Sequence, residues 1–255
     1  MRPSLTAACL AASFLLPAAA QESAPFKFTT GLYRSGGGGL PAEWALDLNL
    51  RYTASWGNAW VGGYRLPHEN FSQARAGWDN TLALGALRVQ PSLQVASGGF
   101  KGGSLYAETG DDWYAGAGLG RTNLKPYVNL NFDPNDAWTL AAGRRWADHE
   151  SLGLLLVGDN REHPDQRHLH LAWRHPRADG DRLTVDLLAK QGLVEGVHVR
   201  RLGATVGYDW PRHFVRLAWD PKVTPQDMVR IFRRAALLGA GASGPVRVCP
   251  AGRRN

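Results

Sequence analysis

The sequence predicts an all-β protein, an up-and-down antiparallel transmembrane β-barrel of about 12 to 14 strands. Three observations predict this fold class: short segments in which apolar and polar residues alternate, turn-forming residues between them, and tryptophans at the ends of the apolar faces. Successive side chains of a strand point to opposite faces, so alternation gives each strand one apolar and one polar face. In a transmembrane barrel the apolar face meets lipid and the polar face lines the interior.

The clearest predicted strand covers residues 44–52, with the sequence WALDLNLRY. Every second residue of this segment is apolar or aromatic, whereas Asp47, Asn49 and Arg51 lie on the other face. Aromatic residues at both ends of an aliphatic face are typical of the girdles of a membrane barrel. The same alternation predicts further strands in residues 87–95, 126–132, 182–187, 202–210 and 215–220.

Turn-forming residues separate the predicted strands at short intervals, as in residues 56–58 (WGN), 133–136 (DPND) and 178–181 (ADGD). Regular strands with short turns and no helical periodicity favour the up-and-down antiparallel topology. We find no linker between two folded units, and we therefore expect one barrel domain over residues 21–230.

The two ends of the chain differ in composition from the barrel domain. Residues 1–20 have the features of a secretory signal peptide: Arg2, a short apolar stretch and a final Ala-Ala-Ala that places cleavage before Gln21. The apolar stretch is too short to span about 30 Å of hydrocarbon as a helix. Residues 231–255 form an atypical tail that is rich in Arg, Gly and Ala and lacks alternation. A genuine extension and a shifted reading frame in place of the closing strand are both open explanations.

The formal net charge of +7 does not indicate a nucleic-acid partner, because six arginines follow Asp227 with no acidic residue among them. The rest of the chain is close to balanced in charge. Cys249 is the only cysteine after the signal peptide, which excludes an internal disulfide bond in the mature chain.

Charged and polar residues on the inward faces are the predicted functional set. Mixed charge along a pore gives mild ion selectivity, whereas a closed lumen would be filled by the same residues in salt bridges. Barrels of about eight strands are filled and those of 16 to 18 leave a channel, so 12 to 14 strands leave both possibilities open. The predicted lumen-lining residues are Asp47, Asn49, Arg51, Arg75, Asp79, Arg88, Gln90, Arg145, Arg182, Asp186, Asp209 and Arg216. The predicted aromatic girdle comprises Trp44, Tyr52, Trp78, Trp138, Trp173, Trp210 and Trp219.

One segment, residues 148–153 (DHESLG), contains a hydrolase-like pattern. His149 and Ser151 share a face if the segment is extended, and a serine nucleophile needs a base within hydrogen-bond reach. The pattern is similar to the H-x-S-x-G of outer-membrane phospholipase A and lipid A deacylases, in which His149, Ser151 and Gly153 match and Leu152 replaces the usual Asn. This resemblance implies a lipid hydrolase. A polar hairpin turn is the favoured interpretation, and we expect no enzymatic activity.

Four histidines, His163, His168, His170 and His175, gather around a polar turn at residues 161–167. His168 and His170 share a strand face and could offer two metal ligands, with Asp165 as a third. The favoured interpretation is that these histidines are solvated in the lumen and the turn. We therefore predict no metal and no cofactor.

The alternation over residues 25–222 resembles that of bacterial outer-membrane β-barrel proteins, most closely an uncharacterised group of small proteobacterial barrels. This resemblance implies a location in the cell outer membrane, with outer-membrane lipid and the barrel-assembly machinery as partners and no nucleic acid. It carries over no activity and no oligomeric state. The strand pattern and the inward-facing charges favour a narrow porin-like passive channel or a structural barrel. The alternatives are a lipid hydrolase and a secreted soluble β-sandwich that binds a ligand.

Overall fold

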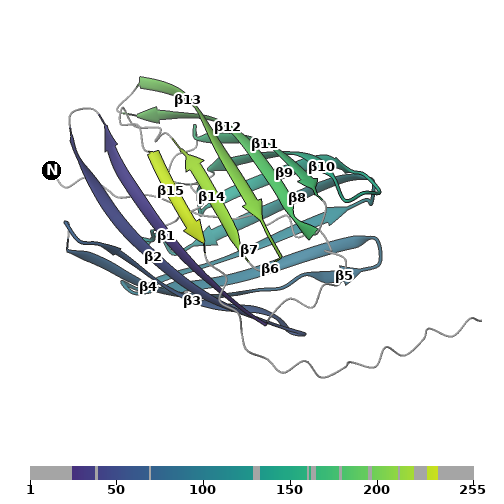
Figure 1. Ribbon diagram of the computed structural model, residues 1–255, viewed down its shortest axis with the longest axis horizontal. Helices are drawn as coiled ribbons and strands as arrows, with labels where there is room; N and C mark the ends of the chain where they lie inside the picture. The colour runs from purple at the N-terminus through teal and green to yellow at the C-terminus, as the bar shows by residue number, and fades with distance from the viewer. Residues whose placement is uncertain are drawn as a thin grey trace, which may run out of the picture.

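The computed structural model describes residues 25–37, 40–68, 70–128, 133–159, 161, 165–177, 180–194, 197–211, 213–220 and 229–234. Fifteen β-strands follow one another along these residues (Figure 1). They are β1 (Phe26–Gly37), β2 (Leu40–Ala54), β3 (Gly57–Leu66), β4 (Phe71–Asp79), β5 (Leu82–Leu84), β6 (Leu87–Ala96), β7 (Phe100–Thr109), β8 (Trp113–Thr122), β9 (Ala137–Arg145), β10 (Ser151–Asp159), β11 (Arg167–Pro176), β12 (Arg182–Val194), β13 (Val197–Asp209), β14 (Phe214–Trp219) and β15 (Val229–Arg234).

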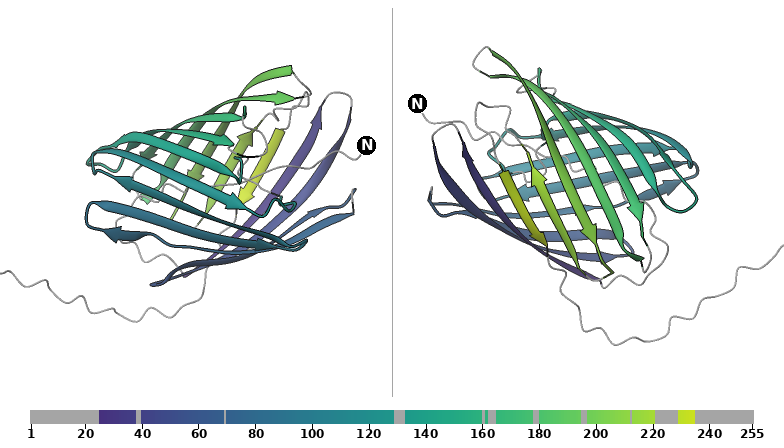
Figure 2. Two further views of the ribbon diagram at one scale, coloured as in Figure 1. Left: turned by 180° about the vertical axis from the view of Figure 1, so that it is seen from behind. Right: turned by 45° about the horizontal axis from the view of Figure 1, so that its top comes forward.

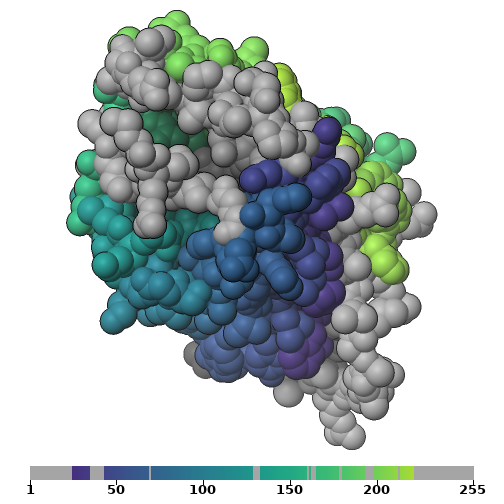
Figure 3. All heavy atoms as spheres, turned by 90° about the vertical axis from the view of Figure 1, so that its left-hand side faces the viewer, coloured from purple at the N-terminus to yellow at the C-terminus, as the bar shows by residue number. Residues whose placement is uncertain are grey.

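The strands form one antiparallel sheet that returns on itself. Each strand pairs with the next strand in the chain, except that β4 pairs with β6 and not with β5. The short β5 pairs with β6 alone, and β1 also pairs with β15. Fourteen strands, all except β5, therefore have a neighbour on both sides. The strands curve around a common interior in both views of Figure 2, and the chain colours follow one another around the end of the molecule in Figure 3. The predicted up-and-down barrel is confirmed, with fourteen strands in its ring.

Strand β2 shows why the sequence folds in this way. Leu46, Leu48 and Leu50 are each about 40% exposed, whereas Ala45 and Asp47 on the opposite face are 4% exposed. The apolar face of the strand is therefore the outside of the barrel, and the polar face points to the interior. This arrangement is the reverse of a soluble β-sandwich, in which the apolar faces of two sheets are buried together.

The two ends of the barrel differ in the length of the connections between strands. At one end, which we call the short-turn end, β2 and β3 are joined at Gly57, whose φ is 118°. A Cβ atom there would lie 2.6 Å from the carbonyl oxygen of Asp79, so this tight turn requires glycine. The opposite end, which we call the long-loop end, carries the longest connection between described strands, residues 123–136.

The strand predicted at residues 126–132 is wrong in the part that the structure describes. Residues 123–128 and 133–136 are not strand, and residues 129–132 lie outside the described residues. Tyr127 is 7% exposed and stacks on Phe100 inside the barrel, so this segment packs against the interior wall and does not form part of the sheet. Among the residues that the structure describes, no helix has the length and apolar character needed to cross a membrane.

Strand β15 lies across the expected boundary between the barrel and the tail at residue 230. It pairs with β14 over residues 229–234 and with β1 at Leu32 and Tyr33. The expected signal peptide, residues 1–20, and residues 235–255 of the expected tail lie outside the described residues.

Candidate functional site

The interior wall is lined by ion pairs between neighbouring or next-neighbouring strands. Most of the predicted lumen-lining charges take part. The pairs are Arg75 with Asp47, Arg51 with Asp79 (3.2 Å), Arg88 with Glu108 (2.8 Å), Arg145 with Glu108 (2.5 Å), Arg182 with Asp209 (2.8 Å) and Lys190 with Asp220. Each of these pairs places a positive and a negative charge side by side on the interior wall.

Glu108 is an interior residue that the sequence analysis did not single out. Its carboxylate accepts hydrogen bonds from Arg88 and Arg145, and its side chain is 5% exposed. Tyr106 on the same face of β7 donates to Glu108 through its hydroxyl group at 3.2 Å. The strand register places Glu108 opposite Arg88. The alternation of residues along β7 puts Glu108 on the inner face, and this pattern could have identified Glu108 from the sequence.

The other predicted lumen residues occupy the same interior face. Arg216 is half-buried on β14, and Asp186 accepts a hydrogen bond from the ring of His170 when Nδ1 carries the proton. Asn49 and Gln90 are half-buried, and Gln90 is opposite the buried Tyr106.

The connection between β8 and β9 enters the barrel, and we call its described residues, 123–128 and 133–136, the inward segment. Gln73 of β4, which is 3% exposed, holds one side of it with two hydrogen bonds. The side-chain amide of Gln73 donates to the carbonyl of Pro126 at 3.1 Å, and its oxygen accepts from the backbone N–H of Val128 at 2.8 Å. Arg75 adds a third bond, donating to the Val128 carbonyl at 3.0 Å. These bonds replace the ladder partners that a strand would have supplied.

Aromatic packing reinforces the same attachment. The ring of Tyr127 stacks on Phe100 of β7, with centroids 4.3 Å apart and planes 23° apart. The guanidinium of Arg75 lies 6.0 Å from the centroid of Tyr127. Phe100 is 1% exposed, so this contact is fully removed from solvent.

The far side of the inward segment contacts β11. Asp133 accepts from the rings of His168 at 2.8 Å and His170 at 3.2 Å when the facing nitrogens carry protons. Going around the ring in either direction, at least five strands separate β4 from β11. The described residues of the inward segment therefore contact two walls of the barrel that are far apart around the ring.

The base of the inward segment is fixed at the long-loop end. Asp136 accepts from the backbone N–H of Thr122 at 3.1 Å and from Arg161 at 3.0 Å, and it also accepts from the Thr122 hydroxyl group. Arg161 donates to the Thr122 carbonyl at 2.9 Å. These contacts join the ends of β8 and β9 to the next loop along the barrel.

Asp133 carries a negative charge in a buried position. Burial alone would raise the pKa of its carboxyl group, but the charge of His170 and hydrogen bonds from His168 and His170 outweigh it and lower that pKa well below its usual value. Asp133 is therefore held as a carboxylate between the two imidazole rings. The exposed Asp165, considered as a third ligand with these histidines, does not occupy this position.

The predicted girdle residues all lie on strands or turns at the ends of the barrel. Trp44, Trp210 and Trp219 are 42% to 45% exposed and Tyr52 is 39% exposed, whereas Trp78, Trp138 and Trp173 are partly covered. The indole of Trp173 donates to Glu150 at 2.7 Å, and that of Trp78 donates to the carbonyl of Trp56 at 3.2 Å. Each indole thus has a polar partner in a turn while its ring covers the outer surface.

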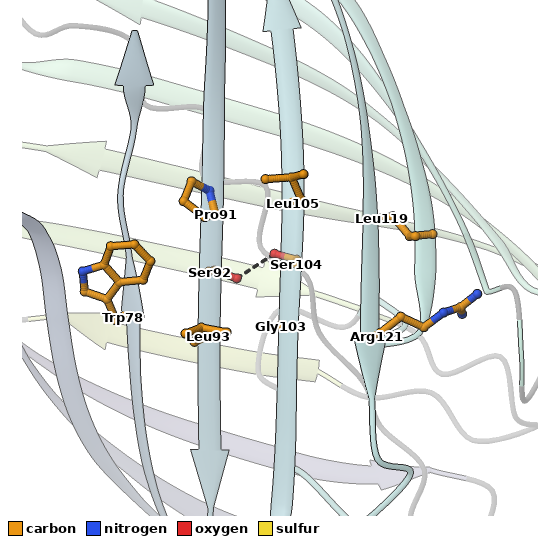
Figure 4. Close-up of a pocket in the computed structure, with 9 residues that line it drawn as sticks. All are labelled: Trp78, Pro91, Ser92, Leu93, Gly103, Ser104, Leu105, Leu119 and Arg121. Carbon is orange, nitrogen blue, oxygen red and sulfur yellow. Dashed lines mark hydrogen bonds between the residues drawn. The ribbon is translucent and has the colours of Figure 1, made fainter. Parts of the chain in front are cut away.

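The outer wall has a shallow depression of about 390 Å³ around Gly103 of β7 (Figure 4). Trp78, Leu93, Leu105 and Leu119 line it, and Arg121 stands at its edge. The depression exists because glycine leaves a gap between larger apolar side chains on adjacent strands. Its apolar lining continues the outer surface of the barrel and adds no catalytic group.

His149 and Ser151, the hydrolase-like pair, do not lie on one face of a strand. His149 lies in the turn between β9 and β10 with φ of 67° and an exposed side chain. Ser151 is the first residue of β10, is 4% exposed and points to the interior, where its strand neighbours are Arg145 and Arg174. The backbone turn through Trp146 and Glu150 separates the two environments.

Comparisons with known proteins give structural neighbours only. No protein-family model matches the chain, and no curated protein matches its sequence. A mutant of the Rh. blastica porin is 11% identical, with 83% of this chain and 99% of that chain covered and a TM-score of 0.46. The Salmonella typhi OmpF complex with daunomycin is 9% identical, with coverages of 83% and 96% and a TM-score of 0.45. Pseudomonas aeruginosa OccK2 in complex with glucuronate is 15% identical, with coverages of 76% and 62% and a TM-score of 0.36.

Proposed function

We propose that the protein is a narrow, porin-like passive channel of the bacterial outer membrane. The observation that carries this proposal is a closed fourteen-stranded barrel whose outside is apolar and whose ion-paired interior contains the inward segment, bonded to β4 and to β11. A barrel of this size lies between the filled eight-stranded barrels and the open porins of 16 to 18 strands. The inward segment narrows the interior further, so the solutes that pass are small.

The paired interior charges support weak ion selectivity. Rings of one charge sign select strongly for the opposite ion, whereas this wall presents Arg75 beside Asp47 and Arg88 beside Glu108. A small polar solute would meet hydrogen-bond donors with positive charge and hydrogen-bond acceptors with negative charge along its path. The proposed cargo class is therefore small hydrophilic molecules and ions of either sign.

The outer surface supports the membrane location. Leucines such as Leu93, Leu105 and Leu187 are more than half exposed on the outer wall, which would be unfavourable in water over so large an area. In outer-membrane barrels the short turns are periplasmic and the long loops extracellular. By that rule the short-turn end faces the periplasm, with outer-membrane lipid around the wall and the barrel-assembly machinery as a partner in insertion.

We infer that the barrel has no hydrolytic activity. The separation of the exposed His149 from the inward-facing Ser151 supports this inference, because a serine nucleophile needs its base within hydrogen-bond reach. Lipase assays of the refolded protein and of Ser151→Ala should give the same background rate. Phospholipid cleavage that Ser151→Ala abolishes would establish the hydrolase instead.

The test of the channel uses the full chain refolded in detergent. Closed barrels keep their structure in SDS, so the unboiled protein should migrate faster on a gel than the boiled protein. Reconstitution of that species in a planar bilayer should then give discrete conductance steps smaller than those of an open 16-stranded porin. A barrel that shifts on the gel but never conducts would replace the channel with a structural barrel.

A further inference from the structure

Three buried side chains from two separate parts of the chain converge inside the barrel. Asp133 comes from the inward segment, and His168 and His170 come from β11. Asp133 Oδ1 lies 2.8 Å from Nδ1 of His168 and 3.2 Å from Nε2 of His170. The possible ligand atoms of the three residues all lie within 4.8 Å of one another.

The spacing suits a metal ion with these ligands. Zn²⁺ binds histidine nitrogen at about 2.0–2.1 Å and carboxylate oxygen at about 2.0–2.2 Å, so two tetrahedral ligand atoms lie roughly 3.3 Å apart. The oxygen-to-nitrogen distances of 2.8 and 3.2 Å need only a small outward movement to reach that value. His168 and His170 are two residues apart on one strand, so the same backbone aims both rings at Asp133.

The second nitrogen of each ring already has a partner. Nδ1 of His170 lies 3.0 Å from Asp186, and Nε2 of His168 lies 2.8 Å from the side-chain amide nitrogen of Gln166. Histidines that bind metal usually donate their other ring N–H to a carboxylate, a backbone carbonyl or a water molecule, which sets the tautomer and the ring orientation. Asp186 is such an acceptor for His170. For His168, the amide of Gln166 has to turn over so that its oxygen accepts from Nε2–H and Nδ1 is left to bind the ion.

The charges of the cluster also favour a cation. Asp133 and Asp186 place two carboxylates around two imidazoles, and Asp186 Oδ1 is buried with no hydrogen-bond partner among the described residues. The nearby cation of Lys190, on the adjacent strand opposite His168, is paired with Asp220. A divalent ion bound by neutral imidazoles would balance the two carboxylates.

We propose that Asp133, His168 and His170 bind one divalent transition-metal ion, with Zn²⁺ as the ion that this ligand set fits best. Three protein ligands leave a fourth position for water. The bound ion ties the inward segment to β11. The effect of this tie on conduction depends on the proposed channel, whereas metal binding itself does not.

The test is a zinc titration of the untagged, full-length refolded protein after treatment with a chelator. We expect one Zn²⁺ per chain in isothermal titration calorimetry, confirmed by elemental analysis after gel filtration. Asp133→Asn and His170→Gln should each weaken binding by about 100-fold or more, and Asp186→Asn should weaken it by about 10- to 100-fold. His213→Gln, which removes an exposed histidine from the turn after β13, is the matched control and should bind as the wild type does.

Gel migration of the unboiled variants shows that each has folded, so loss of zinc binding reports on the site. A wild-type barrel that takes up no zinc, or variants at Asp133 and His170 that bind as well as the wild type, would overturn the proposal. The cluster would then be an ion pair in which a protonated His170 bridges Asp133 and Asp186. Conductance is measured separately on the metal-free protein. A barrel that conducts but takes up no zinc in the titration overturns the metal site alone, and a barrel that binds zinc but does not conduct overturns the channel alone.

Discussion

Arg75 of β4 forms a buried ion pair with Asp47 of β2 across the intervening strand β3, with both side chains about 5% exposed. Gly62 of β3 lies between them, and a Cβ atom there would be 3.7 Å from the Arg75 guanidinium. The same guanidinium donates to the Val128 carbonyl, so one side chain joins two strands and the inward segment.

Replacing Arg75 with methionine should destabilise the barrel and release the inward segment. Loss of one partner from a buried ion pair costs about 3–5 kcal/mol, because the remaining charge is left uncompensated. We expect the unboiled gel band to be lost at a lower temperature, and the single-channel conductance to rise. The double variant Arg75→Met/Asp47→Leu removes both charges and should recover much of the stability. Equal stability of the single variant and the wild type would contradict the assigned pair.

Gln73→Leu should loosen the inward segment while leaving the ion pairs of the wall in place. The leucine keeps the volume of the side chain but leaves the Pro126 carbonyl and the Val128 N–H without their partners, at about 1–3 kcal/mol for each buried group. Current recordings should show larger fluctuations of the open level. Gln90→Leu is the control, because Gln90 is an interior amide of β6 with no hydrogen bond to the described part of the inward segment. Identical recordings from both variants would mean that Gln73 does not restrain the segment.

Glu108→Gln should shift the channel toward anions. Arg88 and Arg145 share this carboxylate, so its neutralisation leaves two adjacent positive charges on one wall. The reversal potential in a salt gradient measures the shift. Asp111→Asn removes the same charge from an exposed position in the β7–β8 turn and should leave the reversal potential unchanged. A similar shift in both variants would indicate an effect of net charge and not of the lumen wall.

Leu48→Arg tests which face of β2 meets lipid. Leu48 is 40% exposed near the middle of the outer face, and arginine at the midplane of a barrel's lipid face costs about 2–4 kcal/mol. Ala54→Arg introduces the same side chain on the same face at the end of the strand, where the cost is about 0–1 kcal/mol. Denaturant unfolding of the barrel in lipid vesicles measures both. Equal destabilisation by the two variants would contradict the proposed position of the membrane.

Much of the barrel wall could be predicted because alternation is a local property of the chain. The faces of β2 and the order of its neighbours follow from residues next to one another, such as Leu48 beside Asn49. The inward segment could not be predicted in this way. Residues 126–128 alternate as a strand does, but their partners Gln73 and Phe100 belong to strands far away in the chain.

The candidate metal site could likewise be predicted only in the part that is local in the sequence. The spacing of His168 and His170 was visible in the sequence and indicated a shared face. Their third partner is Asp133, more than thirty residues earlier, and not the nearby Asp165. Asp133 meets β11 because the connection between β8 and β9 enters the barrel, and no periodicity in the chain encodes that contact.

Among the strand pairs of the ring, β1 and β15 are paired over the shortest length, with Leu32 opposite Ile231 and Tyr33 opposite Arg230. It joins the first and last strands of the ring, so it is also the contact between the most distant parts of the sequence. Ribosomal synthesis supplies β15 after every other strand, and the seam cannot form until then. A chain that stopped before Val229 would keep two unpaired strand edges, at β1 and β14, and such edges recruit strands from other molecules. Closure of the barrel therefore depends on one short strand that is synthesised after all the other described strands.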